Sequence, residues 1–418
     1  MTKFIALRRR PRSEQLGFIE LSTPEKRWKM VQAARPRDSE ELSTLLALGL
    51  KELVPQEPPA EDRFRLLPHA GAYVVHTSEE HLAEEAMRLL EPDYRVVPNI
   101  DLALPQPTLS TIYRRRRPSP YWPEESGVED AHRRGITGEG VLVGVLDTGC
   151  DADHLELRDD RVEFRYVPLH SDPGAMRACR GFDTHGHGTH VSGILAGKHI
   201  GVAPDVSLMV ATVIESETMK TSLERLVIAL DWMLSRFALH ENLSKPTIIN
   251  MSLGFKEEWI APAHLQSVVE GMKSILSNLV VDFDVLPVTA IGNDGPGSMR
   301  APGYYPETLS VGAVDFSLNP ASFSGGGVSP LTNDPEPDTA GYGVDVLSSL
   351  ERDAGGRSIY ARMSGTSIAS PYVAGIAALA ASAHPWLSGP ALRQHVIDNA
   401  MPLQAPQTRV GAGLARFV

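Results

Sequence analysis

Residues 141–147 read VLVGVLD, and Thr148 and Gly149 follow them directly. The run is apolar almost without interruption up to its aspartate, which is typical of a strand buried on both faces of a parallel sheet. Three further runs have the same character, at 206–214, 246–253 and 284–292. Segments with helical spacing alternate with these strands, at 222–237 and 261–279. The alternation predicts an α/β fold, a three-layer domain with a mainly parallel sheet covered by helices on both faces.

The composition is that of a soluble globular protein with room for one large and one smaller domain. The chain has 418 residues, of which 42% are hydrophobic and 22% are charged. Its net charge of −12 argues against non-specific binding to nucleic acid as its main activity. No apolar run approaches the roughly 20 residues that a membrane-spanning helix needs. We therefore expect neither nucleic acid nor a membrane among its partners.

Cysteine usage and the N-terminus predict the compartment. Cys150 and Cys179 are the only cysteines in the sequence. Two are too few for a disulfide framework and fit a reducing compartment, although a single bridge between them stays open as an alternative. The apolar stretch 4–7 is too short for a secretory signal. We expect a cytoplasmic protein, or a secreted one if this N-terminus replaces a signal peptide.

The composition changes at residues 105–126, which contain five prolines and four consecutive arginines. Such a segment is typical of an extended connector. It divides the chain into three parts: 1–104, the linker 105–120, and 121–418. In the first part we expect strands at 3–8, 71–77 and 94–104 and helices at 38–54 and 78–90. This pattern predicts a small α+β domain, with a sheet covered by two helices.

Polar residues follow the predicted strands, at the edge where the site of an open parallel sheet lies. Asp147 ends its strand; alone it would form an Asx turn, and an aspartic protease would need a second Asp-Thr-Gly that this sequence lacks. Residues 183–193 read DTHGHGTHVSG and contain His185, His187 and His190. Three histidines are compatible with a zinc site. The glycines fit better a turn that leads into a helix and lets one histidine face Asp147.

Two more glycine-framed loops carry a hydroxyl and an amide. The triplet 365–367 precedes an alanine-rich helix, and Pro371 places the start of that helix near Ser367. At a helix N-terminus, unpaired backbone N–H groups can stabilise an oxyanion beside the serine oxygen; taken alone, Ser367 would be an N-cap. Asn293, in the loop after the last of the four strands, offers an amide donor that could complete an oxyanion hole.

Seven motifs resemble those of the subtilisin-like serine proteases, the subtilases, and they run in the family's order: VLVGVLDTGCD, HGHGTHVSG, GVAP, INMSLG, AIGNDG, LSVGAVD and MSGTSIASP. The resemblance covers about residues 121–418. It implies that Asp147 orients an imidazole, that His187 is the general base and then the general acid, and that Ser367 is the nucleophile. Asn293 and the backbone N–H of Ser367 would hold the oxyanion, and the other two histidines of the loop would be structural.

The same resemblance implies how a substrate would bind. Ser252, Leu253 and Gly254 match the family's edge segment, which pairs with an extended protein or peptide substrate. Gly292 would form one wall of the pocket for the residue before the scissile bond. Asp294 lies at the expected rim of that pocket, where a carboxylate would favour Arg or Lys.

The chain departs from the family pattern at the high-affinity calcium loop. Only LAGKHIGVAP joins the histidine-bearing helix to GVAP, and Glu156 stands where the family has an aspartate. The resemblance therefore implies that this calcium site is absent and that no cofactor or metal is needed, with a calcium site elsewhere left open. Cys150 is expected to be a buried apolar residue rather than an oxidant sensor.

Residues 1–104 resemble, in length, position and α+β pattern, the N-terminal domain that assists folding and blocks the site in many subtilases. This implies a serine endopeptidase made as a self-inhibited proenzyme, with the Arg114–Arg117 run as a candidate site of self-cleavage. An unrelated accessory domain is the alternative for residues 1–104. For the whole chain, the alternatives are a catalytically silent binding module and a metallohydrolase built on the three histidines.

Overall fold

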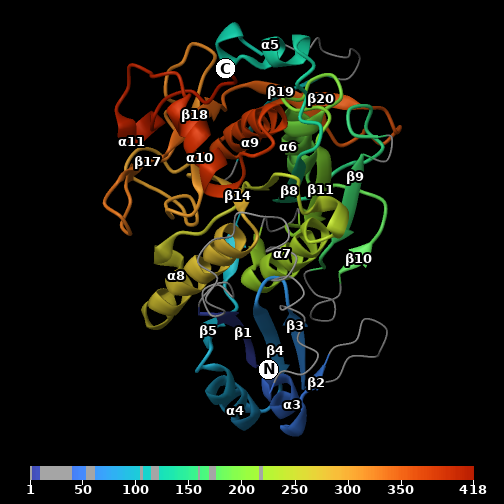
Figure 1. The fold of residues 1–418 in the computed structure, drawn as a ribbon, viewed down its shortest axis with the longest axis vertical. Helices are drawn as coiled ribbons and strands as arrows, with labels where there is room; N and C mark the ends of the chain where they lie inside the picture. Colours follow the sequence, from blue (N-terminus) through green and yellow to red (C-terminus); the bar gives the residue numbers. More distant parts are fainter. Residues whose placement is uncertain are drawn as a thin grey trace.

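The computed structural model describes residues 2–9, 40–52, 62–103, 107–113, 122–158, 161–168, 176–215 and 220–418. A large α/β domain occupies one end of the molecule and a small α+β domain the other (Figure 1). Two helices of the large domain lie between its sheet and the small domain, α7 (Leu223–Phe237) and α8 (Pro262–Ser277). The small domain is therefore seated on the large one through this pair of helices.

The large domain is built on an eight-stranded sheet in the order β10-β9-β11-β8-β13-β14-β15-β18. Neighbouring strands run parallel, except that β10 is antiparallel to β9. The strands are β8 (Leu142–Asp147), β9 (Val162–Tyr166), β10 (Arg177–Ala178), β11 (Ser207–Thr212), β13 (Thr247–Met251), β14 (Val285–Ala290), β15 (Leu309–Val314) and β18 (Thr339–Tyr342). The four strands predicted from apolar runs are β8, β11, β13 and β14, which are neighbours at the centre of the sheet.

Helices cover both faces of this sheet, as the sequence predicts. Helices α6 (His187–Ala196) and α9 (Thr366–Ala383) pack on one face, and α7 and α8 pack on the other. Strand β8 is buried on both of its faces. Val143 and Val145 belong to the core of α6 and α9, whereas Leu142 belongs to the core of α7 and α8. A strand buried on both faces cannot alternate apolar and polar residues, which is why it is apolar throughout.

Helix α9 is the central helix of the larger core. By length and composition it is the one helix among the described residues that could cross a membrane, but 89% of it is buried inside the domain. The sequence was expected to contain no such segment, and that expectation is wrong. A helix that is apolar on every side also fits the middle of a large domain, which is where α9 lies. The peripheral helices of this domain are α5 (Val128–Arg133), α10 (Gly389–Asp398) and α11 (Gln407–Val410).

The small domain has a five-stranded sheet in the order β2-β3-β4-β1-β5. Its strands are β1 (Thr2–Arg8), β2 (Lys51–Glu52), β3 (Arg63–Leu67), β4 (Ala72–Thr77) and β5 (Tyr94–Pro98), and its helices are α3 (Glu40–Ala47) and α4 (Glu80–Leu90). Helix α3 ends well before the predicted residue 54. Gly49 adopts a left-handed conformation with φ of +91° shortly after its end, and β2 follows.

The two faces of the small sheet have different partners. Phe4 and Ala6 pack with α3 and α4, whereas Ile5 and Leu7 join the core of α7 and α8. The approach is close, because a Cβ added to Gly271 of α8 would lie only 2.6 Å from a methyl group of Val97. The small domain therefore completes a hydrophobic core of the large domain.

Two carboxylates of α7 anchor the same interface. Asp231 Oδ1 accepts the backbone N–H groups of His69 and Ala70 at 2.7 and 2.9 Å. In the first turn of the helix, Glu224 Oε1 lies 3.1 Å from Nε2 of the buried His76. Hydrogen bonds to a charged acceptor are among the stronger ones in proteins, so the two bonds to Asp231 add specificity to the apolar packing.

The chain then leaves the small domain and crosses the large one as two short strands. Strand β6 (Asp101–Ala103) pairs antiparallel with β12 (Lys220–Ser222). Strand β7 (Thr108–Tyr113) pairs antiparallel with β20 (Ile359–Ser364), whose other neighbour is β19 (Val346–Leu350). We call β6 and β7 the cleft strands. The prediction of a linker at 105–120 is therefore wrong in part, and the predicted strand 94–104 is divided into β5 and β6. The Arg114–Arg117 run lies outside the described residues.

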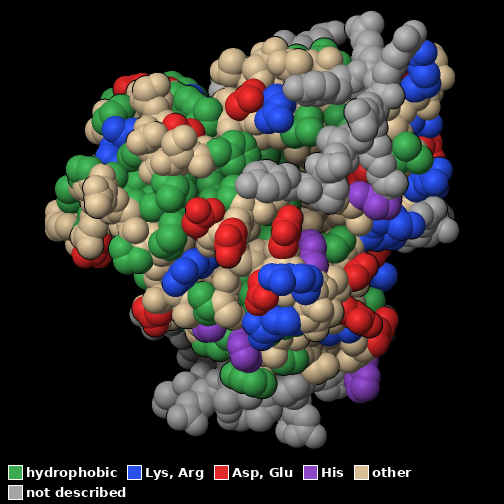
Figure 2. Space-filling model, turned by 90° about the horizontal axis from the view of Figure 1, so that it is seen from above, with side chains coloured by type: hydrophobic (Ala, Val, Ile, Leu, Met, Phe, Trp, Pro, Cys, Tyr) green, Lys and Arg blue, Asp and Glu red, His purple; other side chains and the backbone are tan. Residues whose placement is uncertain are grey.

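Figure 2 views the molecule from above. Hydrophobic side chains gather on one side of this face, and acidic and basic side chains are interspersed over much of the rest. The described part of this face therefore offers no extended surface of a single charge.

Candidate active site

Asp147, His187 and Ser367 come from three distant parts of the chain and meet at the carboxyl end of β8. His187 Nδ1 donates to Asp147 Oδ1 at 2.7 Å, and Ser367 Oγ donates to His187 Nε2 at 3.0 Å. The backbone N–H of Thr148 also donates to Asp147 Oδ1 at 2.7 Å and helps to hold the carboxylate. All three side chains are fully buried. A carboxylate, an imidazole and a hydroxyl in this order can activate the hydroxyl oxygen as a nucleophile.

Glycine makes the position of His187 possible. His187 is the first residue of α6, and Gly186 before it has a φ of +86°, which favours glycine. A Cβ at Gly186 would also lie 1.8 Å from a carboxylate oxygen of Glu351. The glycines of this loop therefore allow the helix to begin at the histidine that faces Asp147.

The helix that carries Ser367 begins at Thr366, close to the predicted start. Pro371 lies inside the helix rather than in its first turn, so the reason for the prediction needs correction. Proline lacks the N–H that would normally bond to the carbonyl four residues earlier, here that of Ser367. The hydroxyl of Ser252 donates to this carbonyl at 3.1 Å and replaces the missing bond.

Asn293 is oriented by the residue before Ser367. Its Oδ1 accepts both the backbone N–H and the hydroxyl of Thr366, each at 2.8 Å. The acceptor end of the amide is thereby engaged, which fixes the direction of its donor end. A Cβ built on Gly365 would lie 3.0 Å from Ser367 Oγ and 3.2 Å from Asn293 Nδ2. One point thus lies within hydrogen-bond distance of both the hydroxyl and the amide, and glycine leaves that point open to a reacting group.

The residues predicted to bind substrate lie beside this centre. Ser252 and Leu253 are fully buried, so their side chains are structural. Gly254 exchanges both backbone hydrogen bonds with Ala103 of β6, at 3.1 and 2.9 Å. The edge predicted to pair with a substrate is therefore paired with the chain's own cleft strand. Gly292 donates its N–H to the hydroxyl of Thr366 at 3.2 Å and so borders the same loop.

Asp294 does not present the free negative charge that was predicted. It forms a bidentate pair with Arg300, at 2.7 and 3.2 Å, and a second ion pair with Lys256 at 3.1 Å. Partial burial raises the pKa of Asp294, but the hydrogen bonds and charges of these two cations outweigh it and hold the pKa below its usual value. Because the carboxylate is already paired with two cations, its attraction for Arg or Lys in a substrate is weaker than expected, and the preference stays a prediction.

The other two histidines of the loop do not converge with His187. His190 Nε2 donates to the carbonyl of Ala361 at 3.1 Å, and burial, aided by the charge of His187, lowers the pKa of His190 to about 3. His185 is exposed. Among the residues that the structure describes, no group of three or more His, Cys, Asp or Glu is placed to hold a metal ion. The geometry gives no support to the metallohydrolase alternative.

Both cysteines are free, with Cys150 buried and Cys179 exposed, so the alternative of a bridge between them is wrong. Burial, with the charge of Asp183 adding to it, raises the pKa of the Cys150 thiol far above its usual value. A thiol that stays protonated is a poor nucleophile. Cys150 therefore fits the prediction of an apolar residue in the core.

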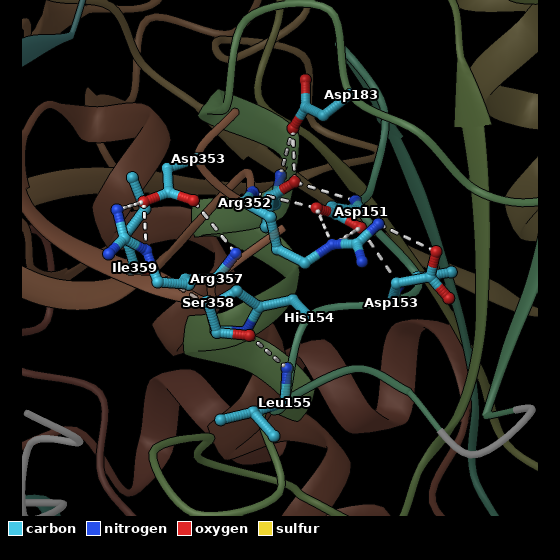
Figure 3. A network of polar contacts seen from close by, with 12 residues as sticks. Asp151, Asp153, His154, Leu155, Asp183, Arg352, Asp353, Arg357, Ser358 and Ile359 are labelled. Carbon is cyan, nitrogen blue, oxygen red and sulfur yellow. Dashed lines mark hydrogen bonds and ion pairs between the residues drawn. The ribbon is translucent and has the colours of Figure 1, made fainter. Parts of the chain in front are cut away.

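The sequence did not reveal the polar network that supports the loop after Asp147 (Figure 3). Arg352 donates to Asp151 at 3.0 Å and to Asp153 at 2.8 Å. On the other side, Asp183 accepts the N–H of Thr189 in the first turn of α6 at 2.6 Å. The partners are separated by as many as 201 residues, so no local pattern could indicate them. The network ties the loops that carry Asp147 and His187 to the end of β19.

Glu156, at the position of the expected calcium ligand, is satisfied by protein donors. Its Oε1 accepts the hydroxyl of Tyr360 at 2.8 Å, and its Oε2 accepts the backbone N–H of His199 at 2.8 Å. The side chain is fully buried. Hydrogen-bond donors therefore surround this carboxylate where a cation would need its oxygens.

Comparison with known proteins gives one consistent result. Residues 138–413 match the subtilase family. The subtilisin-like protease PopC of Myxococcus xanthus (strain DK1622) is 43% identical over 372 residues, which cover 85% of this chain and 77% of that protein. The intracellular serine protease of Paenibacillus polymyxa is 33% identical over 294 residues, or 66% of this chain and 79% of the relative. Subtilisin E of Bacillus subtilis (strain 168) is 34% identical over 290 residues, or 67% and 66%.

The match to PopC is longer than the segment that matches the family as a whole, so it also includes residues outside 138–413. The three-layer fold and the resemblance seen in the motifs agree with this assignment. The chain belongs to the subtilase family and is a serine endopeptidase, a hydrolase that acts on peptide bonds.

Proposed function

We propose that Asp147, His187 and Ser367 form the catalytic triad and that Asn293 completes the oxyanion hole. The observation that supports this most strongly is the continuous chain of hydrogen bonds from Asp147 Oδ1 through the imidazole to Ser367 Oγ, at 2.7 and 3.0 Å. In the neutral imidazole, Nδ1–H is held by the carboxylate, which leaves Nε2 free to accept the serine proton.

The reaction follows from these positions. Ser367 Oγ attacks the carbonyl carbon of the scissile bond while its proton moves to His187 Nε2. The negative charge that develops on the carbonyl oxygen is stabilised by Asn293 Nδ2 and the backbone N–H of Ser367 at the positive end of α9. The imidazolium then protonates the leaving amine, and an acyl-enzyme remains. Water, deprotonated by His187, attacks the acyl group and restores the serine.

We infer that the chain is made as a proenzyme and that its own strands β6 and β7 block the cleft. Ala103 lies between Gly254 and β12. Pro107 lies beside the loop that carries Ser367, with its Cα 3.6 Å from the Cβ position of Gly365. The small domain, held on α7 and α8, keeps the cleft strands in place and acts as the inhibitor.

A protein or peptide substrate replaces the cleft strands by the same main-chain pairing. Hydrogen bonds to Gly254 and β12 supply affinity, and the neighbouring side-chain pockets supply specificity. Neither this binding nor the chemistry requires calcium at the family's high-affinity site, because Tyr360 and His199 already satisfy Glu156.

The test compares the wild-type chain with Ser367→Ala, purified side by side at full length. The wild type is expected to separate into an N-terminal fragment and a large fragment, with peptidase activity rising as the fragment is released or degraded. Ser367→Ala is expected to stay whole and inactive. If both proteins stay whole, or both are cut at the same rate, self-processing is wrong. If Ser367→Ala hydrolyses a reporter peptide as fast as the wild type, the triad assignment is wrong.

A further inference from the structure

We propose that Arg300 determines which residue the enzyme accepts before the scissile bond, and that its side chain restricts this position to small residues such as glycine, alanine and serine. The proposal rests on the proposed function, because it takes Ser367 as the point of cleavage and Asn293 as the oxyanion donor. The candidate site is the space between Gly254 and Gly292, and the ligand is the substrate side chain directly before the scissile bond.

Gly254 and Gly292 border the position that this side chain would take. Gly254 exchanges both backbone hydrogen bonds with Ala103 of the cleft strands, so it marks the path along which a chain approaches the triad. Gly292 directly precedes Asn293, and its N–H donates to the hydroxyl of Thr366 at 3.2 Å. A residue that joins the paired position to the reacting carbonyl therefore passes between the two glycines.

The side chain of Arg300 fills the space between these glycines. A Cβ built on Gly254 would lie 3.1 Å from Arg300 Cβ. A Cβ built on Gly292 would lie 3.0 Å from Arg300 Cγ and 3.5 Å from Arg300 Cδ. Arg300 itself is only 7% exposed. The aliphatic part of its side chain therefore lies against both glycines as the floor of this space, and little depth remains for a substrate side chain.

Three contacts hold Arg300 in this position. Its guanidinium forms a bidentate pair with Asp294 at 2.7 and 3.2 Å, and its central carbon lies 5.0 Å from the centre of the Trp259 ring. Its backbone N–H donates to the carbonyl of Ile291 at 2.9 Å. Bidentate pairs between arginine and a carboxylate are among the stronger polar contacts, and the aromatic ring adds a cation–π attraction. A large substrate side chain would have to disrupt these contacts in order to displace Arg300.

Asp294 does not make the site favourable for a basic residue. Its carboxylate is shared between Arg300 and Lys256, and Lys256 Nζ also lies 3.5 Å from the exposed Glu258. An Arg or Lys side chain of a substrate would have to compete with two protein cations for the same oxygens. Because these side chains are also long, we expect them to be disfavoured together with large apolar ones.

The first experiment measures the preference of the wild type. The full chain is cut once, at a recognition sequence for a site-specific protease placed between Arg114 and Tyr121, and the N-terminal fragment is separated. Reporter peptides are identical except for the residue before the scissile bond, which is alanine, leucine, phenylalanine or arginine, and mass spectrometry verifies the bond that is cut. Extra volume forced into a filled space costs the equivalent of about 5–100-fold. We expect kcat/KM for the alanine peptide to exceed that for the phenylalanine and arginine peptides by at least about tenfold.

These peptides distinguish failure of this proposal from failure of the proposed function. Equal kcat/KM for the four peptides, or fastest cleavage of the leucine, phenylalanine or arginine peptide, would overturn the role of Arg300 while the proposed function stands. If none of the peptides is cleaved, the proposed function fails and the role of Arg300 fails with it.

Two substitutions then test whether Arg300 causes the preference. Arg300→Gly removes the floor, and we expect the ratio of kcat/KM for phenylalanine over alanine to rise by at least about tenfold, because a large apolar side chain gains from burial. Arg300→Lys keeps most of the aliphatic chain and a cation for Asp294, and as the matched control it is expected to keep the preference for alanine. Labelling of Ser367 with a fluorophosphonate probe shows which variants are folded. A labelled Arg300→Gly protein with the same ratio as the wild type would overturn the proposal.

Discussion

Two substitutions of Asn293 distinguish the role of its N–H donor from the role of its oxygen acceptor. Asn293→Leu removes both ends of the amide, whereas Asn293→Asp keeps an oxygen for Thr366 and loses only the N–H donor. Loss of such a donor typically costs about 10²–10³-fold in kcat, as it does in subtilisin. Both variants should lose at least this much, with KM little changed, because the donor acts on charge that forms only in the transition state. Asn293→Asp should be no faster than Asn293→Leu, since it adds a negative charge beside the oxyanion.

The free energy of unfolding should rank the two variants in the opposite order, with Asn293→Asp more stable than Asn293→Leu. Thr366 is fully buried, and its N–H and hydroxyl both donate to Asn293 Oδ1 at 2.8 Å. In Asn293→Leu the hydroxyl can rotate to another acceptor but the backbone N–H cannot. One buried unsatisfied donor costs about 1–3 kcal/mol. Asn293→Asp keeps this acceptor and should lie closer to the wild type in free energy of unfolding.

The kcat is measured by steady-state kinetics on a short reporter peptide. The enzyme is freed of its N-terminal fragment by cleavage at a recognition sequence for a site-specific protease placed between Arg114 and Tyr121. The free energy of unfolding is measured by denaturant unfolding of the same variants in the Ser367→Ala background. Asp294→Asn is the neighbouring control and should keep the wild-type kcat, since Asp294 contacts Arg300 and Lys256 rather than the reacting groups. Wild-type kcat in Asn293→Leu, or equal loss of stability in the two Asn293 variants, would contradict the roles assigned to the two ends of the amide.

Three further outcomes are expected. Asp231→Ala should weaken inhibition by about 10–100-fold when the N-terminal fragment is added back to enzyme that lacks it, because two backbone N–H groups lose their charged acceptor. Glu85→Ala, at an exposed position, is the control. Equal inhibition constants for Asp231→Ala and the wild type would contradict the interface. The pKa of His190 falls from 6.5 to about 3 on folding through burial and the charge of His187. The unfolded chain therefore binds an extra proton between these values, and stability drops by about 1.4 kcal/mol for each pH unit as the pH falls. In the Ser367→Ala protein, His190→Gln should reduce the dependence of the free energy of unfolding on pH in this range, as measured by denaturant unfolding. An unchanged dependence on pH would count against this prediction. A chelator should leave the Tm of Ser367→Ala unchanged, whereas a fall of Tm that calcium reverses would show that Glu156 is not satisfied by Tyr360 and His199 alone.

The centre of the fold and of the candidate site could be predicted because both have local signatures. Strand β8 is buried on two faces and is therefore continuously apolar, and the same holds for its neighbours. Asp147, His187 and Ser367 each sit in a glycine-flanked motif whose backbone geometry requires those glycines. Such features leave their mark within about ten residues of sequence.

The parts that the sequence missed depend on distant contacts. Strand β7 keeps Leu109 and Ile112 exposed, so no apolar alternation distinguishes it from a linker. Asp294 is neutralised by Lys256 and Arg300, and Lys256 lies far from it in the sequence. Pro371 could stand inside a helix only because the hydroxyl of Ser252 reaches the carbonyl of Ser367. In each case a partner brought close by folding decides the outcome.

Covalent labelling with a fluorophosphonate probe, followed by mass spectrometry of the modified peptide, tests the triad assignment most directly in enzyme freed of its N-terminal fragment. We predict one adduct, on Ser367, that is absent in Ser367→Ala and forms far more slowly in His187→Ala. Labelling of Ser367→Ala to the same extent as the wild type, or rapid labelling of Ser367 without His187, would contradict it.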